Sequence, residues 1–256
     1  NGDDFVKARK MEQPFQKTAA DIKILADKEL NFRVYNTTER LDAGARTSYF
    51  HNNLAGYHGA KLKRYQELIE NHISKGNMAV LNMLNTRYFI TPKGQVQKNQ
   101  GALGNAWFVN EINIVSNADA EIAALDRFEP INSAIVDQRF KEEIIEGLDN
   151  SNAEISLLEY KPNYLKYNSN SIKDGIAIFS EIYYDKGWNA YIDGELVPHF
   201  RANYVLRGLQ IPKGNHIVEF KFEPSTYRNG ELVSFASSII LFLLIAFVSY
   251  KEITTS

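Results

Sequence analysis

The sequence predicts an α+β protein that ends in a membrane-spanning helix. Three observations carry this prediction: apolar residues at helical spacing in the first hundred residues, short extended runs separated by turn residues in the second half, and a long uncharged stretch near the C-terminus. We therefore divide the 256 residues into an α-rich mixed region at 1–103, an antiparallel, jelly-roll-like β-sandwich at 104–226, and a transmembrane helix with a short tail at 227–256.

Helical signals dominate the first region. Residues 57–73 predict its longest helix, because apolar side chains recur at helical spacing while charged residues fill the other face. Shorter helices are expected at 18–27 and 78–84, and strands at 32–36 and 87–90. The polar loop at 93–104 marks the expected domain boundary.

Strand signals dominate the second region. An apolar, β-branched stretch at 106–115 is followed by a helix at 117–128, capped by Asn117, and by a strand at 133–136. Turn residues such as Asp193-Gly194 then separate six extended runs, which predicts an antiparallel sandwich. The run with apolar residues on both faces, at 176–179, is expected to be a central strand. The six runs are 154–160, 164–168, 175–184, 188–192, 204–210 and 216–222.

The expected membrane span begins at Leu232 and ends at Tyr250. It contains no Asp, Glu, Lys, Arg, His or Pro, and its length is close to the roughly 20 apolar residues that a helix needs to cross a bilayer. Membrane lipid is therefore the expected partner of this stretch. The alternative is a buried core helix, which the absence of a polar face disfavours.

Composition excludes several classes of function. A net charge of −2 argues against a nucleic-acid partner, and the absence of cysteine excludes disulfides, thiolate catalysis and cysteine-ligated zinc. No P-loop, zinc-protease or nucleophile-elbow motif occurs, so no cofactor is expected in this chain. The start at Asn1, without a signal peptide, suggests a fragment of a longer polytopic protein or a tail-anchored protein.

The segment at 181–212 contains the first candidate binding residues, Trp188, Tyr191, Arg201 and Asn203. Aromatic rings beside planar hydrogen-bonding groups are typical of sugar-binding faces, because the apolar face of a pyranose stacks on a ring while its hydroxyls need directional partners. The alternative is structural, since strand alternation is expected to bury some of these rings in the sandwich core.

Two further sets of residues are candidate sites. His51, Tyr57 and His58 lie in a loop rich in His, Asn, Tyr and Gly, which either faces a ligand or caps the following helix. No third metal ligand is evident beside the two histidines, so no metal site is expected. The carboxylates available for glycoside hydrolysis lie mostly in expected turns, and no catalytic residue is assigned to them. They are Glu181, Asp185 and Asp193.

Five blocks of sequence, taken in order, resemble the C-terminal extracytoplasmic part of YfhO-type bacterial membrane proteins. The blocks are residues 3–25, 48–70, 77–90, 181–194 and 200–224, followed by the terminal span. The resemblance implies a polytopic protein of the GT-C type in the bacterial cell membrane, with residues 1 to about 230 on the extracytoplasmic side. It also implies a polyprenyl-phosphate-linked sugar donor for the whole protein.

The resemblance implies an accessory role for this piece of the protein. In GT-C enzymes the catalytic acidic residue lies in an early external loop, which has no counterpart here, so we expect no catalysis by this chain alone. We expect it to bind an acceptor or another glycan, or to gate the active-site cavity, during modification of cell-envelope polysaccharide. The alternatives are a stand-alone carbohydrate-binding module and a structural or protein-interaction domain of the envelope.

Overall fold

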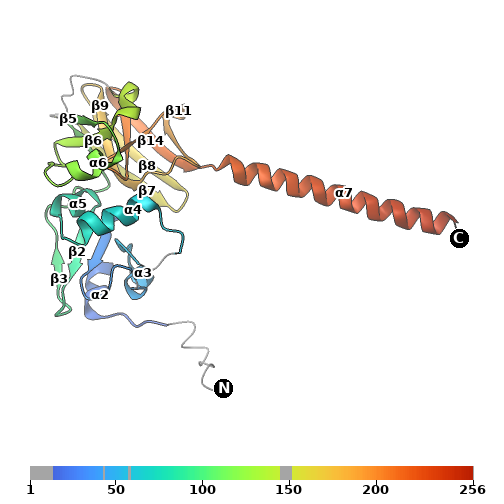
Figure 1. The fold of residues 1–256 in the computed structure, drawn as a ribbon, viewed down its shortest axis with the longest axis horizontal. Coiled ribbons are helices and arrows are strands. Elements are labelled where there is room, and N and C mark those ends of the chain that lie inside the picture. Colours follow the sequence, from blue (N-terminus) through green and yellow to red (C-terminus); the bar gives the residue numbers. More distant parts are fainter. Residues whose placement is uncertain (1–13, 43, 57–58, 145–151, 256) are drawn as a thin grey trace, which may run out of the picture.

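Helices and strands are mixed along the chain, and an apolar helix forms its C-terminal end, which confirms the α+β class (Figure 1). The structure is a computed structural model, and it describes residues 14–42, 44–56, 59–144 and 152–255. A β-sandwich and the smaller N-terminal layer pack together, and the C-terminal helix projects away from both.

Two sheets form the sandwich. The five-stranded sheet has the order β11-β10-β14-β8-β7, and all of its neighbouring strands are antiparallel. The six-stranded sheet has the order β4-β9-β13-β12-β6-β5, and its β5 and β6 form a parallel pair. The strands are β4 (Ala106–Val109), β5 (Glu111–Val115), β6 (Ser133–Asp137), β7 (Glu154–Lys161), β8 (Tyr164–Ser171), β9 (Gly175–Ile182), β10 (Trp188–Ile192), β11 (Glu195–Val197), β12 (Phe200–Ala202), β13 (Leu206–Ile211) and β14 (Gly214–Phe222).

The core between the two sheets is centred on three aromatic rings. The ring of Phe179 on β9 lies 4.9 Å from that of Tyr167 on β8 and 4.9 Å from that of Phe220 on β14, in both cases edge to face. All three side chains are fully buried. Edge-to-face packing of this kind adds to the free energy of burial, so these rings fix the spacing of the two sheets.

Strand β9 is buried on both faces, as the sequence predicts. Ala177 and Phe179 point into the core between the sheets, while Ile176 and Ile178 belong to a second core on the opposite face of the six-stranded sheet. That second core is covered by helices from both halves of the chain. They are α4 (Lys63–Leu68), the π-helix η2 (Ile69–Ile73), α5 (Met78–Met83) and α6 (Ala118–Ala124). Residues on both sides of position 104 share this core, and the division into domains stays a prediction.

The N-terminal layer contains a three-stranded sheet and two short helices. Ile24 of α2 packs on Val34 and Ile90 of this sheet in a small third core. Its strands β1 and β2 run parallel. The elements of the layer are α2 (Ala19–Leu25), β1 (Arg33–Asn36), α3 (Arg46–Phe50), β2 (Thr86–Ile90) and β3 (Val96–Lys98).

The longest expected helix and the apolar run at 106–115 both differ from the sequence-based expectation. The helix expected at 57–73 begins at Lys63, and its last turn is wider, with Ser74 N donating to Ile69 O at 2.9 Å. The apolar run at 106–115 forms two strands, because Asn110 and Glu111 both donate their backbone N–H to Asn132 O and turn the chain. Strands β4 and β5 therefore lie at opposite edges of the same sheet. The 3₁₀-helix η3 (Gln138–Glu143) follows β6.

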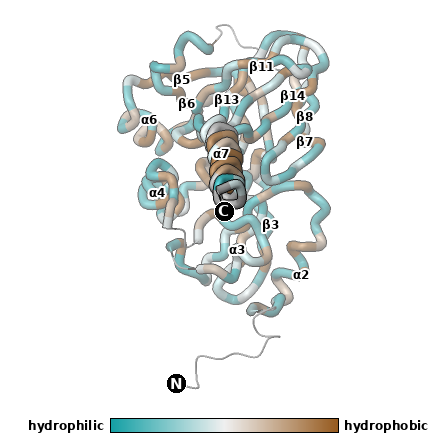
Figure 2. The backbone as a smooth tube through the Cα atoms, turned by 90° about the vertical axis from the view of Figure 1, so that its right-hand side faces the viewer, coloured by the Kyte–Doolittle hydropathy of each residue, from teal (hydrophilic) through white to brown (hydrophobic). Residues whose placement is uncertain are grey.

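The C-terminal helix α7 (Ser225–Thr255) extends away from the rest of the protein as a single rod (Figures 1 and 2). Its segment Ser225–Phe247 is long and apolar enough to cross a membrane, and none of its most apolar window is buried. Large side chains such as Leu241 and Leu243 are 58% and 65% exposed. The alternative of a buried core helix is therefore wrong, and the helix supports membrane association.

Replacing Phe179 by alanine removes the central ring of the inter-sheet core. We expect Phe179→Ala to lower the free energy of unfolding by about 3–5 kcal/mol, because the cavity adds to the lost burial. Leu158→Ala, on the exposed side of β7 at 50% exposure, should change it by about 0.5 kcal/mol or less. Urea unfolding of both variants in detergent measures this, and equal losses would contradict the assignment of the core.

A charge in the middle of α7 tests its membrane association. Leu241→Arg should reduce the share of the chain that resists alkaline extraction from membranes, because arginine at a helix centre disfavours insertion by about 2.5–3.5 kcal/mol. Leu241→Ile keeps the apolar surface and should behave as the wild type. Equal extraction of the arginine and isoleucine variants would show that α7 does not insert.

Candidate functional site

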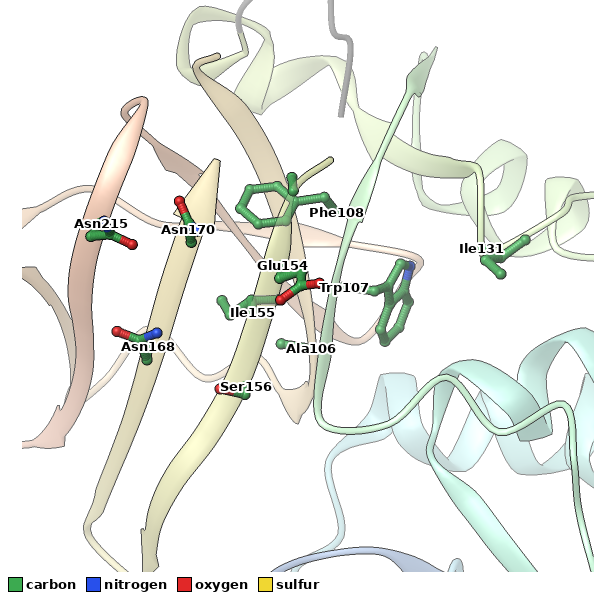
Figure 3. A pocket seen from close by; sticks show the side chains of 11 residues that line it. Ala106, Trp107, Phe108, Ile131, Glu154, Ile155, Ser156, Asn168, Asn170 and Asn215 are labelled. Atoms are coloured by element: carbon green, nitrogen blue, oxygen red, sulfur yellow. The ribbon is translucent and has the colours of Figure 1, made fainter. Parts of the chain in front are cut away.

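A polar groove of about 500 Å³ crosses the outer side of the five-stranded sheet and ends against β4. We call it the asparagine groove and define it by Asn168, Asn170, Asn215, Glu154 and Trp107. Figure 3 shows the three asparagines on one side of the groove, Trp107 on the other and Glu154 between them.

Strand alternation places the asparagines. Leu165 and Tyr167 of β8 point into the sandwich core, so Asn168 and Asn170 point outward. Ser169 and Ser171 are the inward, buried residues at the end of the strand. Inward and outward side chains thus alternate along β8 as far as Ser171, although the inward residues at its end are serines and not apolar residues.

The register of the sheet aligns these side chains in rows. Asn170 lies opposite Glu154 of β7 and opposite Asn215 of β14, and Asn168 lies opposite Ser156 of β7. Directly opposed residues in antiparallel strands have Cβ atoms about 5 Å apart. The groove floor is therefore a grid of hydrogen-bonding groups across three strands.

The groove has the chemistry of a site for a polyhydroxylated ligand. Each asparagine amide offers two donors and an acceptor, and the side chains of Asn168, Asn170 and Asn215 form no hydrogen bond with the described residues. Trp107 is held by a hydrogen bond from its Nε1 to Pro130 O at 2.7 Å. Ile131, 53% exposed, adds an apolar rim on which the apolar face of a ring could rest.

Two of the predicted sugar-binding residues lie on opposite faces of β10. Trp188 points inward, 4.1 Å from ring centre to the guanidinium carbon of the buried Arg207. Tyr191 points outward, and its hydroxyl donates to Glu223 Oε2 at 2.6 Å. Tyr191 lines a separate cleft of about 800 Å³ where the chain enters α7. Alternation along one strand thus separates the two rings.

The other two predicted residues, Arg201 and Asn203, belong to the six-stranded sheet and its following turn, and both are buried. Asn203 Oδ1 accepts a hydrogen bond from Ile135 N at 2.8 Å, which joins the turn to β6. The four residues therefore do not share one face, since Trp188 packs against Arg207, Tyr191 lines the cleft at α7, and Arg201 and Asn203 are buried. Their role in ligand binding stays a prediction.

His51 has a structural role in the N-terminal layer. Its Nε2 lies 3.0 Å from Asp21 Oδ1, and its side chain is buried. Arg46 and Thr18 also bind the Asp21 carboxylate, which is fully buried. The other two predicted loop residues, Tyr57 and His58, lie outside the described residues.

The three carboxylates considered for glycoside hydrolysis have different surroundings. Asp193 and Gly194 have φ angles of 52° and 86° and form the predicted hairpin turn, with Asp193 Oδ2 2.7 Å from His216 Nδ1. Glu181 accepts a hydrogen bond from Asn31 Nδ2 at 2.9 Å. Asp185 lies on the exposed loop after β9. Within the described parts of the chain, no group of three or more His, Asp or Glu could hold a metal ion.

The asparagine groove was not predictable from the strand expected at 164–168. That strand stops before Asn170, because Ser169 and Ser171 do not look like core residues. The signal was nevertheless present as the alternation Asn-Ser-Asn-Ser at the end of β8, in which every second polar residue continues the outward face.

Part of the chain is similar to a family of membrane proteins. Residues 137–234 match the family described as bacterial membrane protein YfhO, which confirms the resemblance over this part of the chain. The matched part contains strands β7 to β14 and the start of α7. No curated protein and no solved structure matches the chain.

The Asp21 carboxylate makes stability depend on pH. Burial raises its pKa, but hydrogen bonds from Arg46, Thr18 and His51 outweigh burial and lower the pKa well below the usual range. Its stabilising effect is therefore complete above the unfolded pKa of about 4 and is lost as the pH falls further.

We expect Asp21→Asn to cost about 3 kcal/mol at pH 7, because it leaves buried partners unpaired. The difference from the wild type should shrink by about 1 kcal/mol at pH 3, where the unfolded wild type takes up a proton. Urea unfolding at the two pH values measures this. A difference that is the same at both would rule out the ionised carboxylate as its source.

Proposed function

We propose that the chain is the extracytoplasmic accessory part of a polytopic, glycosyltransferase-like membrane protein that modifies cell-envelope polysaccharide, and that the asparagine groove binds the glycan. The observation that carries this proposal is the grid of asparagine side chains on the outer side of the sheet. The match to a membrane protein family and the exposed apolar helix α7 support the location.

The position of the groove favours a glycan acceptor over the reacting lipid-linked sugar. Strand β14 starts beside Asn215 and ends at Phe222, next to α7. Seven residues of strand span about 23 Å, so the groove lies about that far from the start of α7. A polyprenyl-phosphate-linked donor, which is a substrate of the whole protein in this proposal, would be held closer to the membrane by other parts of the protein.

A second candidate function is contact with another envelope protein. The N-terminal layer exposes several large apolar side chains beside a cleft of about 370 Å³, and such patches occur at protein interfaces. They are Ile22, Leu25, Leu30 and Tyr49, which are 45–61% exposed. A glycan-independent pull-down from envelope extract, lost in Leu25→Asp, would favour this function.

Glycan binding by the full chain in detergent tests the first proposal. The chain would be applied to an array of bacterial envelope glycans, and the best ligand titrated by calorimetry. Replacing both Asn168 and Asn170 by alanine should weaken binding about 30-fold, because each lost hydrogen bond contributes about 1 kcal/mol.

The matched control is Asn189→Ala. Asn189 is the same residue type on another strand of the same sheet, but it lies outside the groove and binds Glu223 at 3.0 Å. This variant should bind glycan as the wild type does. Unchanged affinity in the Asn168/Asn170 double variant, or no glycan bound at all, would reject the groove as a glycan site.

A further inference from the structure

Another cleft, of about 280 Å³, lies between α4 and the end of β9. We call it the arginine cleft and define it by Arg64, Arg201, Tyr183, Tyr184 and Tyr204. It shares no residue with the asparagine groove.

Arginine and carboxylate side chains form a network at the inner end of the arginine cleft. The fully buried Glu121 accepts hydrogen bonds from Arg64 Nη1 at 3.0 Å and from Arg201 Nη2 at 3.4 Å. The neighbouring Asp137 pairs with Arg139 at 3.1 Å and lies 3.8 Å from Arg201. A third carboxylate, that of Glu67, accepts a hydrogen bond from the Tyr204 hydroxyl and lies near Arg64.

Arg201 is not fully compensated by these carboxylates. Its side chain is more than nine-tenths buried, and its Nε has no hydrogen-bond partner. Burial lowers the pKa of Arg201, Glu121 raises it, and the nearby Arg64 and Arg139 lower it again, so that the pKa stays below its usual value. A buried cation in this state is stabilised by a further anion.

Strained backbone holds one wall of the arginine cleft. Asn203 and Tyr204 have φ angles of 49° and 71°, in the left-handed region, which costs about 1–3 kcal/mol for each residue that is not glycine. This turn brings the Tyr204 ring to 4.4 Å from the Arg64 guanidinium carbon, and Tyr204 N donates to Glu121 Oε1 at 3.0 Å. Strain of this kind clusters at ligand sites.

The outer part of the arginine cleft offers aromatic surface. Tyr184 is 38% exposed, and Tyr183 lies beside it. Lys63 and Asp185 stand at the opening and carry opposite charges. A ring-shaped ligand can therefore pack on the tyrosines while an acidic substituent reaches the arginines.

We propose that the arginine cleft binds a sugar that carries an oxyanion, either a carboxylate, as in a uronic acid, or a phosphate. Arg64 and Arg201 bind the acidic group, and Tyr184 packs against the sugar ring. A carboxylate and a phosphate can each offer two oxygens that accept parallel hydrogen bonds from a planar guanidinium.

Calorimetric titration of the full chain in detergent with glucuronic acid, glucose 1-phosphate and neutral glucose tests this proposal. At least one of the two acids should bind, and glucose should bind at least tenfold more weakly. Arg64→Ala should weaken acid binding roughly tenfold or more, because it removes a charge-assisted hydrogen bond. Lys75→Ala is the matched control, since it removes a positive charge from an exposed position outside the cleft, and it should change the affinity less than twofold.

Arg64 also contacts Glu121, so a folding defect must be separated from lost binding. Tyr184→Ala leaves the ion pairs intact and should weaken acid binding as well, with an unchanged thermal midpoint. The Asn168/Asn170 double variant should bind the acids normally. Equal binding of glucose and the acids, no binding of either acid, or full affinity in Arg64→Ala and Tyr184→Ala would overturn the proposal.

Discussion

The double burial of the six-stranded sheet is the constraint on which the rest of the structure depends. Its strand β9 faces the five-stranded sheet on one side and the helical layer on the other. Polar groups in this sheet therefore need partners from other elements. Ser180 meets this need through Gly104 O at 2.9 Å, and its own carbonyl accepts from Arg33 Nη1 at 2.7 Å. These bonds connect the N-terminal layer to the sandwich, so the two halves of the chain pack directly against each other.

The same constraint distributes the available binding surface. Because the six-stranded sheet is covered twice, the outer side of the five-stranded sheet is the broad strand surface left open to solvent in the described chain, and the asparagine groove lies there. The arginine cleft instead arises where the helical layer meets the end of β9, and its charges are the ones that this junction buries. One site is thus built from exposed neutral amides, and the other from charged groups that burial has left incompletely compensated.

The fold was predictable where local pattern and tertiary context agree. Asn117 caps α6 as expected, Asp193 and Gly194 form the hairpin turn, and the apolar run at 176–179 lies in an interior strand. The candidate sites were not predictable, because they depend on which strands become neighbours. Asn215 joins Asn170 through a pairing between strands more than forty residues apart in sequence. Likewise, the sequence around Trp188 is typical of a ring that stacks on a sugar, but in the fold this ring packs on Arg207 of the partner sheet.

The junction between β14 and α7 couples the domain mechanically to the bilayer. Only Glu223 and Pro224 separate the strand from the helix, and Glu223 N is tied to Gly187 O at 2.6 Å, while the proline ring fixes one of the two backbone torsions of its residue. These two features restrict the conformations that the junction can adopt. A tilt of α7 in the membrane would accordingly be transmitted to the loop after β9, which borders the arginine cleft on one side and the cleft at the helix base on the other.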